Sequence, residues 1–182
     1  QDGLGPSRPL TFEDCVTWAR LRFEELFNNV PRQLLHNFPL DQVTSSGQPF
    51  WSGAKKPPTP LTFTAEDPEH LNFVKTAANM RAKMYGIKGR QDDSFFVQFL
   101  PSVMVPDFAP REGVKIAVKD SEEEEQKQQG GGGGVSNLED LDSQCQQIVG
   151  DLPSPSSLAG FRLEAIDFDK DDDEHMALVM AA

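Results

Sequence analysis

Apolar residues recur every three or four positions from residue 12 onward, a spacing that places them on one face of a helix. This apolar stripe consists of Phe12, Cys15, Val16, Ala19, Phe23, Leu26 and Phe27. Thr11 precedes the stripe and Asp14 follows three residues later, which is the pattern of a capping box. The sequence therefore predicts a helix that begins after Thr11 and turns the stripe toward a core.

A second, shorter helix is predicted to begin at Pro31, because proline is favoured in the first helical turn. This helix would turn Leu34, Leu35 and Phe38 inward. Pro39 should end it, since proline cannot continue a helix.

The run from Pro68 to Tyr85 is apolar around most of a helical circumference. Asp67 can cap this helix, and Gly86 follows its end. The polar residues form one narrow stripe, which consists of Asn72, Thr76, Asn79 and Lys83. A helix with so much apolar surface is usually buried between layers, so we expect it to be the central helix of the fold.

The remaining predicted elements are shorter. Asp92 or Asp93 should cap a helix that ends at Pro101. Alternating residues and helical periodicity then predict strands at 113–118 and 161–168, a helix at 136–149 and a final helix at 175–182. The fold class is therefore mainly α-helical, with a few short strands and long loops.

The final helix repeats part of the central one. EHMALVMAA at Glu174–Ala182 matches EHLNFVKTA at Glu69–Ala77 with His, Val and the last Ala in register. The earlier copy continues through further helical turns, whereas the later copy stops in mid-pattern. We therefore expect the chain to end inside a helix.

Composition and charge argue against several classes of function. A chain of 182 residues fits one domain, and it contains no apolar run near the ~20 residues that a membrane-spanning helix needs. The net charge of −12 argues against nucleic acid as a direct partner, because phosphate binding needs clustered Lys and Arg. Residues 120–135 are acidic and glycine-rich, which predicts a flexible linker. No Lys-Ser/Thr follows those glycines, so the tract does not have the pattern of a phosphate-binding loop.

Two cysteines do not make a disulfide framework or a metal site, and they indicate a reducing, intracellular compartment. Cys15 lies in the apolar stripe beside Glu13 and Asp14, which oppose thiolate formation, so a core role is favoured over a nucleophilic one. Cys145 has no basic neighbour, and we expect a structural or surface thiol.

Histidine and aspartate residues also suggest sites, but their spacing favours structural roles. His36, His70 and His175 show no metal-ligand spacing, so we expect them to pack against or cap helices. The acidic residues near the C-terminus do not form a calcium loop and instead predict a solvated turn that caps a helix: Asp167, Asp169, Asp171, Asp172 and Asp173.

Phe50 and Trp51, near Lys55 and Lys56, combine aromatic and basic residues as some nucleic-acid sites do. The acidic net charge and the prolines that follow make a packed corner the better interpretation. We therefore expect no catalytic, cofactor or metal residue within this chain.

Several separated strings resemble ubiquitin-activating enzymes, specifically the downstream, larger part of their second catalytic cysteine half-domain. In chain order they are TFEDCVTWAR, RQLLHNFP, SSGQPFWSG, PTPLTF, EHLNFVKTAANMRAKMYGI, VPDFAPREGVKI and LPSPSSLAGFRLEAIDFDKDDD, with HMALVMAA at the end. Members of this family commonly carry two more residues between the acidic triplet and the histidine. The acidic turn of this chain is therefore expected to be shorter.

The resemblance implies one lobe of a multidomain enzyme. It implies a leader at 1–9 and a helical body at 10–119, followed by the linker at 120–135. A helix and a strand at 136–168 would complete the domain. Residues 169–182 would form an acidic turn and a truncated helix that returns to the adenylation domain. The family's thioester cysteine lies in a CT-x-x-x-FP-like string, which this chain does not contain, so it is expected upstream of Gln1.

The implied activity belongs to a parent enzyme in the cytoplasm and nucleus, and the isolated chain is expected to be inactive. The parent uses ATP and magnesium in its adenylation domain, carries ubiquitin as a cysteine thioester and hands it to a ubiquitin-conjugating enzyme. Its implied partners are ubiquitin, that conjugating enzyme and the adenylation domain of the same chain. The alternative is a non-catalytic helical interaction module with a disordered acidic arm.

Overall fold

The computed structural model describes residues 5, 7–44, 46–114, 116, 138–158, 160 and 163–182, without the side chains of 138–141 and 155. The described part is mainly α-helical, as the sequence predicts, and its only β pairing is an isolated antiparallel bridge between Val43 and Pro49. These residues belong to two compact units. One is drawn from Gln1–Arg8 and Gly113–Gly160, the other from Pro9–Glu112 and Phe161–Ala182. The predicted linker at 120–135 lies outside the described residues.

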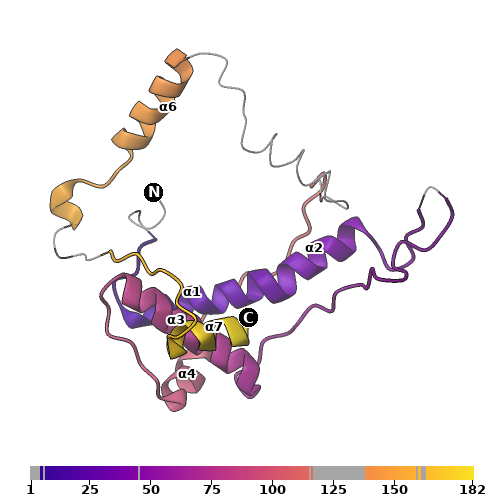
Figure 1. Ribbon diagram of the computed structural model, residues 1–182, viewed down its shortest axis with the longest axis horizontal. Helices are drawn as coiled ribbons and strands as arrows, with labels where there is room; N and C mark the ends of the chain where they lie inside the picture. Colours follow the sequence, from indigo (N-terminus) through magenta and orange to yellow (C-terminus); the bar gives the residue numbers. More distant parts are fainter. Residues whose placement is uncertain are drawn as a thin grey trace. The chain divides into compact units, whose positions relative to one another are not determined.

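The larger unit begins with one long helical stretch (Figure 1). It consists of α1 (Phe12–Phe23), the π-helical segment η1 (Glu24–Asn29) and α2 (Val30–Asn37). The predicted capping box is present, because the Asp14 N–H donates to the Thr11 hydroxyl and the Asp14 carboxylate accepts from the Thr11 N–H. The second predicted helix is present as α2 with Pro31 in its first turn, and it follows α1 and η1 without an intervening loop.

Pro31 is accommodated by the π-helical turn in front of it. Proline has no N–H, and its ring clashes with the carbonyl four residues earlier, here that of Phe27. The Val30 N–H reaches back five residues to the Glu25 carbonyl, which marks the wider π turn. The Phe27 carbonyl accepts instead from the Leu61 N–H, with 2.8 Å between nitrogen and oxygen. A π turn holds one residue more than an α turn, so it shifts the register of the apolar stripe. Leu26 is 48% exposed and does not lie in the core as predicted.

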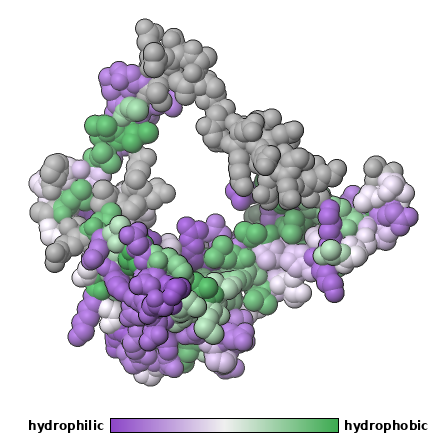
Figure 2. All heavy atoms as spheres, in the orientation of Figure 1, coloured by the Kyte–Doolittle hydropathy of each residue, from purple (hydrophilic) through white to green (hydrophobic). Residues whose placement is uncertain are grey.

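The core lies between α1, α3 (Pro68–Met84), α4 (Asp93–Phe99) and the 3-10 turn η2 (Leu100–Ser102), with α7 (Asp173–Ala181) packed on α3. The buried residues of α1 are five members of the predicted stripe, and α3 buries Phe73, Val74, Ala77, Ala78 and Ala82. Small residues on α3 let its neighbours approach closely, which confirms the prediction of a central helix. In Figure 2 hydrophilic residues cover much of this part of the unit.

Two predicted strands are not found. Residues 163–168 are extended but lie in no sheet, and their backbone is tied to α3 by one hydrogen bond from the Glu164 N–H to the Met84 carbonyl. No second strand lies beside them in the described part, so alternation alone could not produce a ladder. Of the strand expected at 113–118, the described residues 113, 114 and 116 are likewise not in a strand, and the others lie outside the described residues.

The smaller unit contains α6 (Leu138–Gly150) and the 3-10 turn η3 (Pro155–Leu158). The helix confirms the periodicity predicted at 136–149, although residues 136 and 137 lie outside the described part. Cys145 and Ile148 of this helix are both exposed.

Candidate functional site

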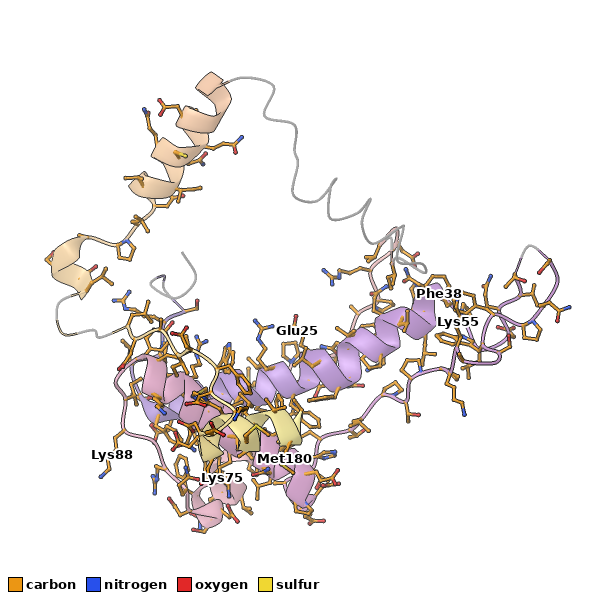
Figure 3. All side chains as sticks on the ribbon, in the orientation of Figure 1. Glu25, Phe38, Lys55, Lys75, Lys88 and Met180 are labelled. Carbon is orange, nitrogen blue, oxygen red and sulfur yellow. The ribbon has the colours of Figure 1, made fainter. Side chains whose placement is uncertain are left out.

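A pocket of the larger unit lies at the start of α3. It encloses ≈ 590 Å³. Phe23, Phe27 and Leu61 line one part of it with apolar side chains, and polar side chains of α3 line another. The end of α7 also borders the pocket. In Figure 3 Lys75 on α3 and Met180 on α7, which both line the pocket, lie close together. A smaller pocket of ≈ 290 Å³ continues along α3 and shares Asn72 and Lys75 with the first. Together the two pockets form what we call the α3 groove.

The α3 groove follows the polar stripe predicted on α3. Asn72, Thr76 and Asn79 line it, and Lys75 pairs across it with Asp93 of α4 at 2.7 Å between Nζ and Oδ1. The Asn79 amide donates to the Arg90 carbonyl at 2.7 Å and accepts from the Arg90 N–H at 2.9 Å. These polar groups are used to hold α4 and the preceding loop against α3. The stripe is therefore structural, and the groove holds neighbouring segments rather than a reacting centre.

The two cysteines lie in opposite environments. Cys15 is fully buried in α1, and this burial raises the pKa of its thiol to about 11, while Arg81 lowers it and Asp14 and Glu13 raise it further. A thiol with this pKa is protonated at neutral pH and is a poor nucleophile. Cys145 is exposed on α6. The core role expected for Cys15 is confirmed, and of the two roles left open for Cys145, structural or surface, the structure shows the surface one.

The histidines pack and cap, as expected from their positions. His70 and His175 each accept a backbone N–H at Nδ1, from Thr64 at 3.2 Å and from Asp169 at 2.9 Å. His36 on α2 lies 3.2 Å through Nε2 from the Glu112 carboxylate. These contacts tie loop segments to helices.

The acidic string near the C-terminus forms a capping turn. Asp172 caps α7 by accepting from the Glu174 and His175 N–H groups, and Lys83 lies 3.7 Å from its carboxylate. Hydrogen bonding from the His175 N–H is the main cause of the lowered pKa of Asp172, against a smaller opposing effect of desolvation. Across the described ranges, no group of three or more His, Cys, Asp or Glu side chains is arranged to hold a metal ion.

The aromatic and basic residues around Trp51 form the packed corner that the sequence favours. The Phe38 and Phe50 rings stack with 4.7 Å between centroids, and Lys55 lies 4.7 Å from the centre of the Phe50 ring. The Trp51 indole N–H donates to the Phe38 carbonyl at 3.0 Å. Phe38 and Lys55 appear together at the far end of α2 in Figure 3.

Sequence reasoning missed Gln33, a buried polar residue of α2. Its Nε2 donates to the Arg111 carbonyl and its Oε1 accepts from the Arg111 N–H, at 3.0 Å and 2.9 Å. The amide therefore pairs with a backbone that is 78 residues away in the chain. No local pattern in the sequence predicts this contact, because a glutamine next to an arginine is equally common on a helix face that is exposed to solvent.

Comparison with known proteins assigns the chain to a family. The family model described as "Ubiquitin-activating enzyme, SCCH domain" matches residues 2–182, and the chain belongs to this family. It is 47% identical over 184 residues to the human protein named "Ubiquitin-like modifier-activating enzyme 1", covering all of this chain. It is also 47% identical over 166 residues to the Dictyostelium discoideum protein of the same name, covering 91% of this chain.

The match extends to the yeasts. The Schizosaccharomyces pombe protein "Ubiquitin-activating enzyme E1 1" is 44% identical over 184 residues, again covering all of this chain. The chain spans only 16% of the human and Dictyostelium relatives and 17% of the fission-yeast one. Among the described residues, no helix is both long enough and apolar enough to cross a membrane.

Proposed function

We propose that this chain works within a longer ubiquitin-activating enzyme, as the body of the domain that carries ubiquitin as a cysteine thioester. The domain would present that thioester to a ubiquitin-conjugating enzyme. The observation that carries the proposal is the family match over residues 2–182, together with 44–47% identity to ubiquitin-activating enzymes. The partners proposed are ubiquitin, the conjugating enzyme and the adenylation domain of the same polypeptide.

The chemistry of the chain fits a supporting role. Cys15 is held in the core as a protonated thiol, because Arg81 lowers its pKa by less than burial raises it. A thioester-forming cysteine needs a base or cation that generates thiolate near pH 7. The nucleophile is therefore proposed to lie upstream of Gln1 in the parent enzyme. ATP and magnesium are proposed to act in the parent's adenylation domain.

A segment exchange tests this proposal. Residues 2–182 replace the matching segment of the human relative, and the hybrid is incubated with ubiquitin, ATP and magnesium. We expect a thiol-sensitive ubiquitin adduct on the hybrid and its transfer to a conjugating enzyme. The matched control is the same hybrid with Cys15→Ala, which should form the adduct equally well.

The hybrid also separates failure of the proposal from failure to fold. ATP–pyrophosphate exchange reports on the adenylation domain, and the melting curve reports on the inserted segment. A folded hybrid that adenylates ubiquitin but forms no thioester would contradict the proposed role. Loss of the adduct in the Cys15→Ala hybrid alone would assign the nucleophile to Cys15.

A further inference from the structure

The two helices that share the internal sequence repeat begin with the same constellation of side chains. Asp67 caps α3 by accepting from the Glu69 and His70 N–H groups at 2.9 Å and 3.4 Å. Asp172 caps α7 by accepting from the two equivalent N–H groups at 2.8 Å and 3.2 Å. The sequences FTAEDPEH and FDKDDDEH therefore produce one local structure twice.

The histidine completes each constellation. Nδ1 of His70 accepts the Thr64 N–H, and Nδ1 of His175 accepts the Asp169 N–H, in both instances from six residues earlier. The residue before each donor is a phenylalanine that stacks on the imidazole. Phe63 lies 5.8 Å from His70 at an interplanar angle of 24°, and Phe168 lies 6.1 Å from His175 at 26°. We call these two structures the paired histidine caps.

Each bond fixes the tautomer of its histidine. A backbone N–H can only donate, so Nδ1 must offer a lone pair and the ring proton must sit on Nε2. The Asp67 and Asp172 carboxylates lie 3.9 Å from the respective Nε2 atoms, on the side where that proton sits. A second proton can enter only at Nδ1, where it uses the lone pair that holds the backbone N–H.

From this geometry we propose that the paired histidine caps are a proton-sensitive device that secures the starts of α3 and α7. Imidazoles take up protons between about pH 5 and 8. Protonation breaks the bonds from Thr64 and Asp169 and detaches the two segments that lead into the helices. The stability that these bonds contribute is present when the imidazoles are neutral and is lost as the pH falls.

The charged groups around the caps decide how well an added charge is tolerated. His70 faces Asp67, the Phe23 ring of α1 and Phe63. The Arg20 guanidinium lies over the Phe63 ring, 4.3 Å from its centre. His175 is 7% exposed and faces Asp172 and Phe168, with Lys83 of α3 paired to the same carboxylate. On their own helices the neighbouring acids are Glu69, Asp173 and Glu174. The carboxylates already face Nε2 and cannot replace the bond lost at Nδ1, and both helix N-termini disfavour a cation.

Substitution with asparagine or glutamine distinguishes the two ring nitrogens. Asparagine places a non-titrating acceptor near the position of Nδ1, whereas glutamine places its polar group near Nε2. The double variants His70→Asn/His175→Asn and His70→Gln/His175→Gln are compared with the natural chain by amide hydrogen exchange, corrected for the intrinsic effect of pH. His36→Asn is the matched control, because the contact given by His36 in the described part of the chain is to the Glu112 side chain and not to a backbone N–H.

In the natural chain and in the His36→Asn control, protection of the Thr64 and Asp169 amides should fall about tenfold as the pH is lowered from 7.5 through the range in which imidazoles take up protons, as expected for one lost hydrogen bond at each. The double asparagine variant should lose no protection over this range, and the double glutamine variant should already lack it at pH 7.5. Protection in the natural chain that does not change with pH would overturn the proposal. So would an equal loss in the asparagine variant.

Imidazole ¹⁵N shifts of the natural chain give a test that does not depend on whether a variant folds. At pH 7.5 both histidines should show an unprotonated Nδ1 and a protonated Nε2. A proton on Nδ1 at that pH would also overturn the proposal.

Discussion

At the scale of single residues, the contrast between the two cysteines is open to direct measurement. Burial raises the pKa of Cys15 from 9.0 to about 11, so near pH 8 its thiolate fraction is about a hundredfold lower than that of an ordinary thiol. We expect a thiol reagent to modify Cys145 rapidly and Cys15 at least about a hundredfold more slowly. Denaturant should make the two rates equal.

A Cys145→Ala variant provides the control for this measurement. It should show only the slow phase in the folded state, because its one remaining thiol is buried. A fast phase in that variant would mean that Cys15 is accessible and would weaken its assignment to the core.

Asp14 should contribute to the acid sensitivity of the fold. Desolvation raises the pKa of its carboxyl, but hydrogen bonds from Leu10 and Thr11 outweigh that effect and lower it below the ordinary 3.8. The carboxylate therefore contributes stability that is complete above about pH 4 and is lost as the pH falls through the folded pKa. Asp14→Asn should flatten this part of the curve of unfolding free energy against pH, measured by denaturant titration. An unchanged slope in the Asp14→Asn variant would contradict this assignment.

At the scale of elements, the cap of α3 can be removed by one substitution. Asp67→Ala leaves the Glu69 and His70 N–H groups without their acceptor, and we expect it to cost about 1 kcal/mol of unfolding free energy. Asp67→Asn should restore most of that loss, because its amide oxygen can accept the same bonds. Glu66→Ala, at an exposed neighbouring position, should stay within about 0.5 kcal/mol of the natural chain. An equal loss in the Glu66 and Asp67 variants would argue against capping as the cause.

The π-helical turn before Pro31 makes a second element-scale prediction. Pro31→Ala supplies a backbone N–H that can bond the Phe27 carbonyl in ordinary α-helical register. It therefore competes with the Leu61 N–H for that oxygen. We expect the Leu61 amide to lose about tenfold of its hydrogen-exchange protection, the effect of one displaced bond.

Pro39→Ala is the control for this experiment, because Pro39 lies beyond the end of α2. It should leave the Leu61 amide protected as in the natural chain. If Pro31→Ala also leaves that protection unchanged, the π turn does not depend on the proline.

Some elements could be predicted from sequence because their signals are local. The Thr11–Asp14 capping box, the Asp67 cap and the apolar circumference of α3 each involve residues within a few positions of one another. The continuous helix through Pro31 could not be predicted, since it depends on the Leu61 N–H, 34 positions beyond Phe27 in the numbering. The contact between Gln33 and Arg111 could not be predicted for the same reason, because it joins residues that are far apart in the sequence. The strand at 161–168 failed because alternation specifies a two-faced segment but supplies no neighbouring strand.

At the scale of the whole molecule, the proposed division of labour predicts that the isolated chain is inactive. Given ubiquitin, ATP and magnesium, residues 1–182 should form no reducible ubiquitin adduct, because Cys15 is protonated and buried. Joining the chain to the adenylation domain and the upstream cysteine segment of a relative should restore the adduct. A thiol-sensitive band from the chain alone, abolished by Cys15→Ser, would contradict this prediction.

The bond between Leu61 and Phe27 also has a mechanical consequence. The helical stretch from Phe12 to Asn37 is roughly 39 Å long at 1.5 Å per residue, and the chain returns from its far end toward α3 as an extended segment. The returning segment contacts the helical stretch at three places. The Trp51 indole N–H donates to the Phe38 carbonyl at the far end, the Leu61 N–H donates to the Phe27 carbonyl, and Phe63 packs on Phe23. Because the extended segment is attached to the helical stretch at three places, the pair should bend less than an isolated helix would. The helical stretch and the returning segment should therefore move together as one rigid body. A force applied at the far end of α2 would then be transmitted to the core at Phe23.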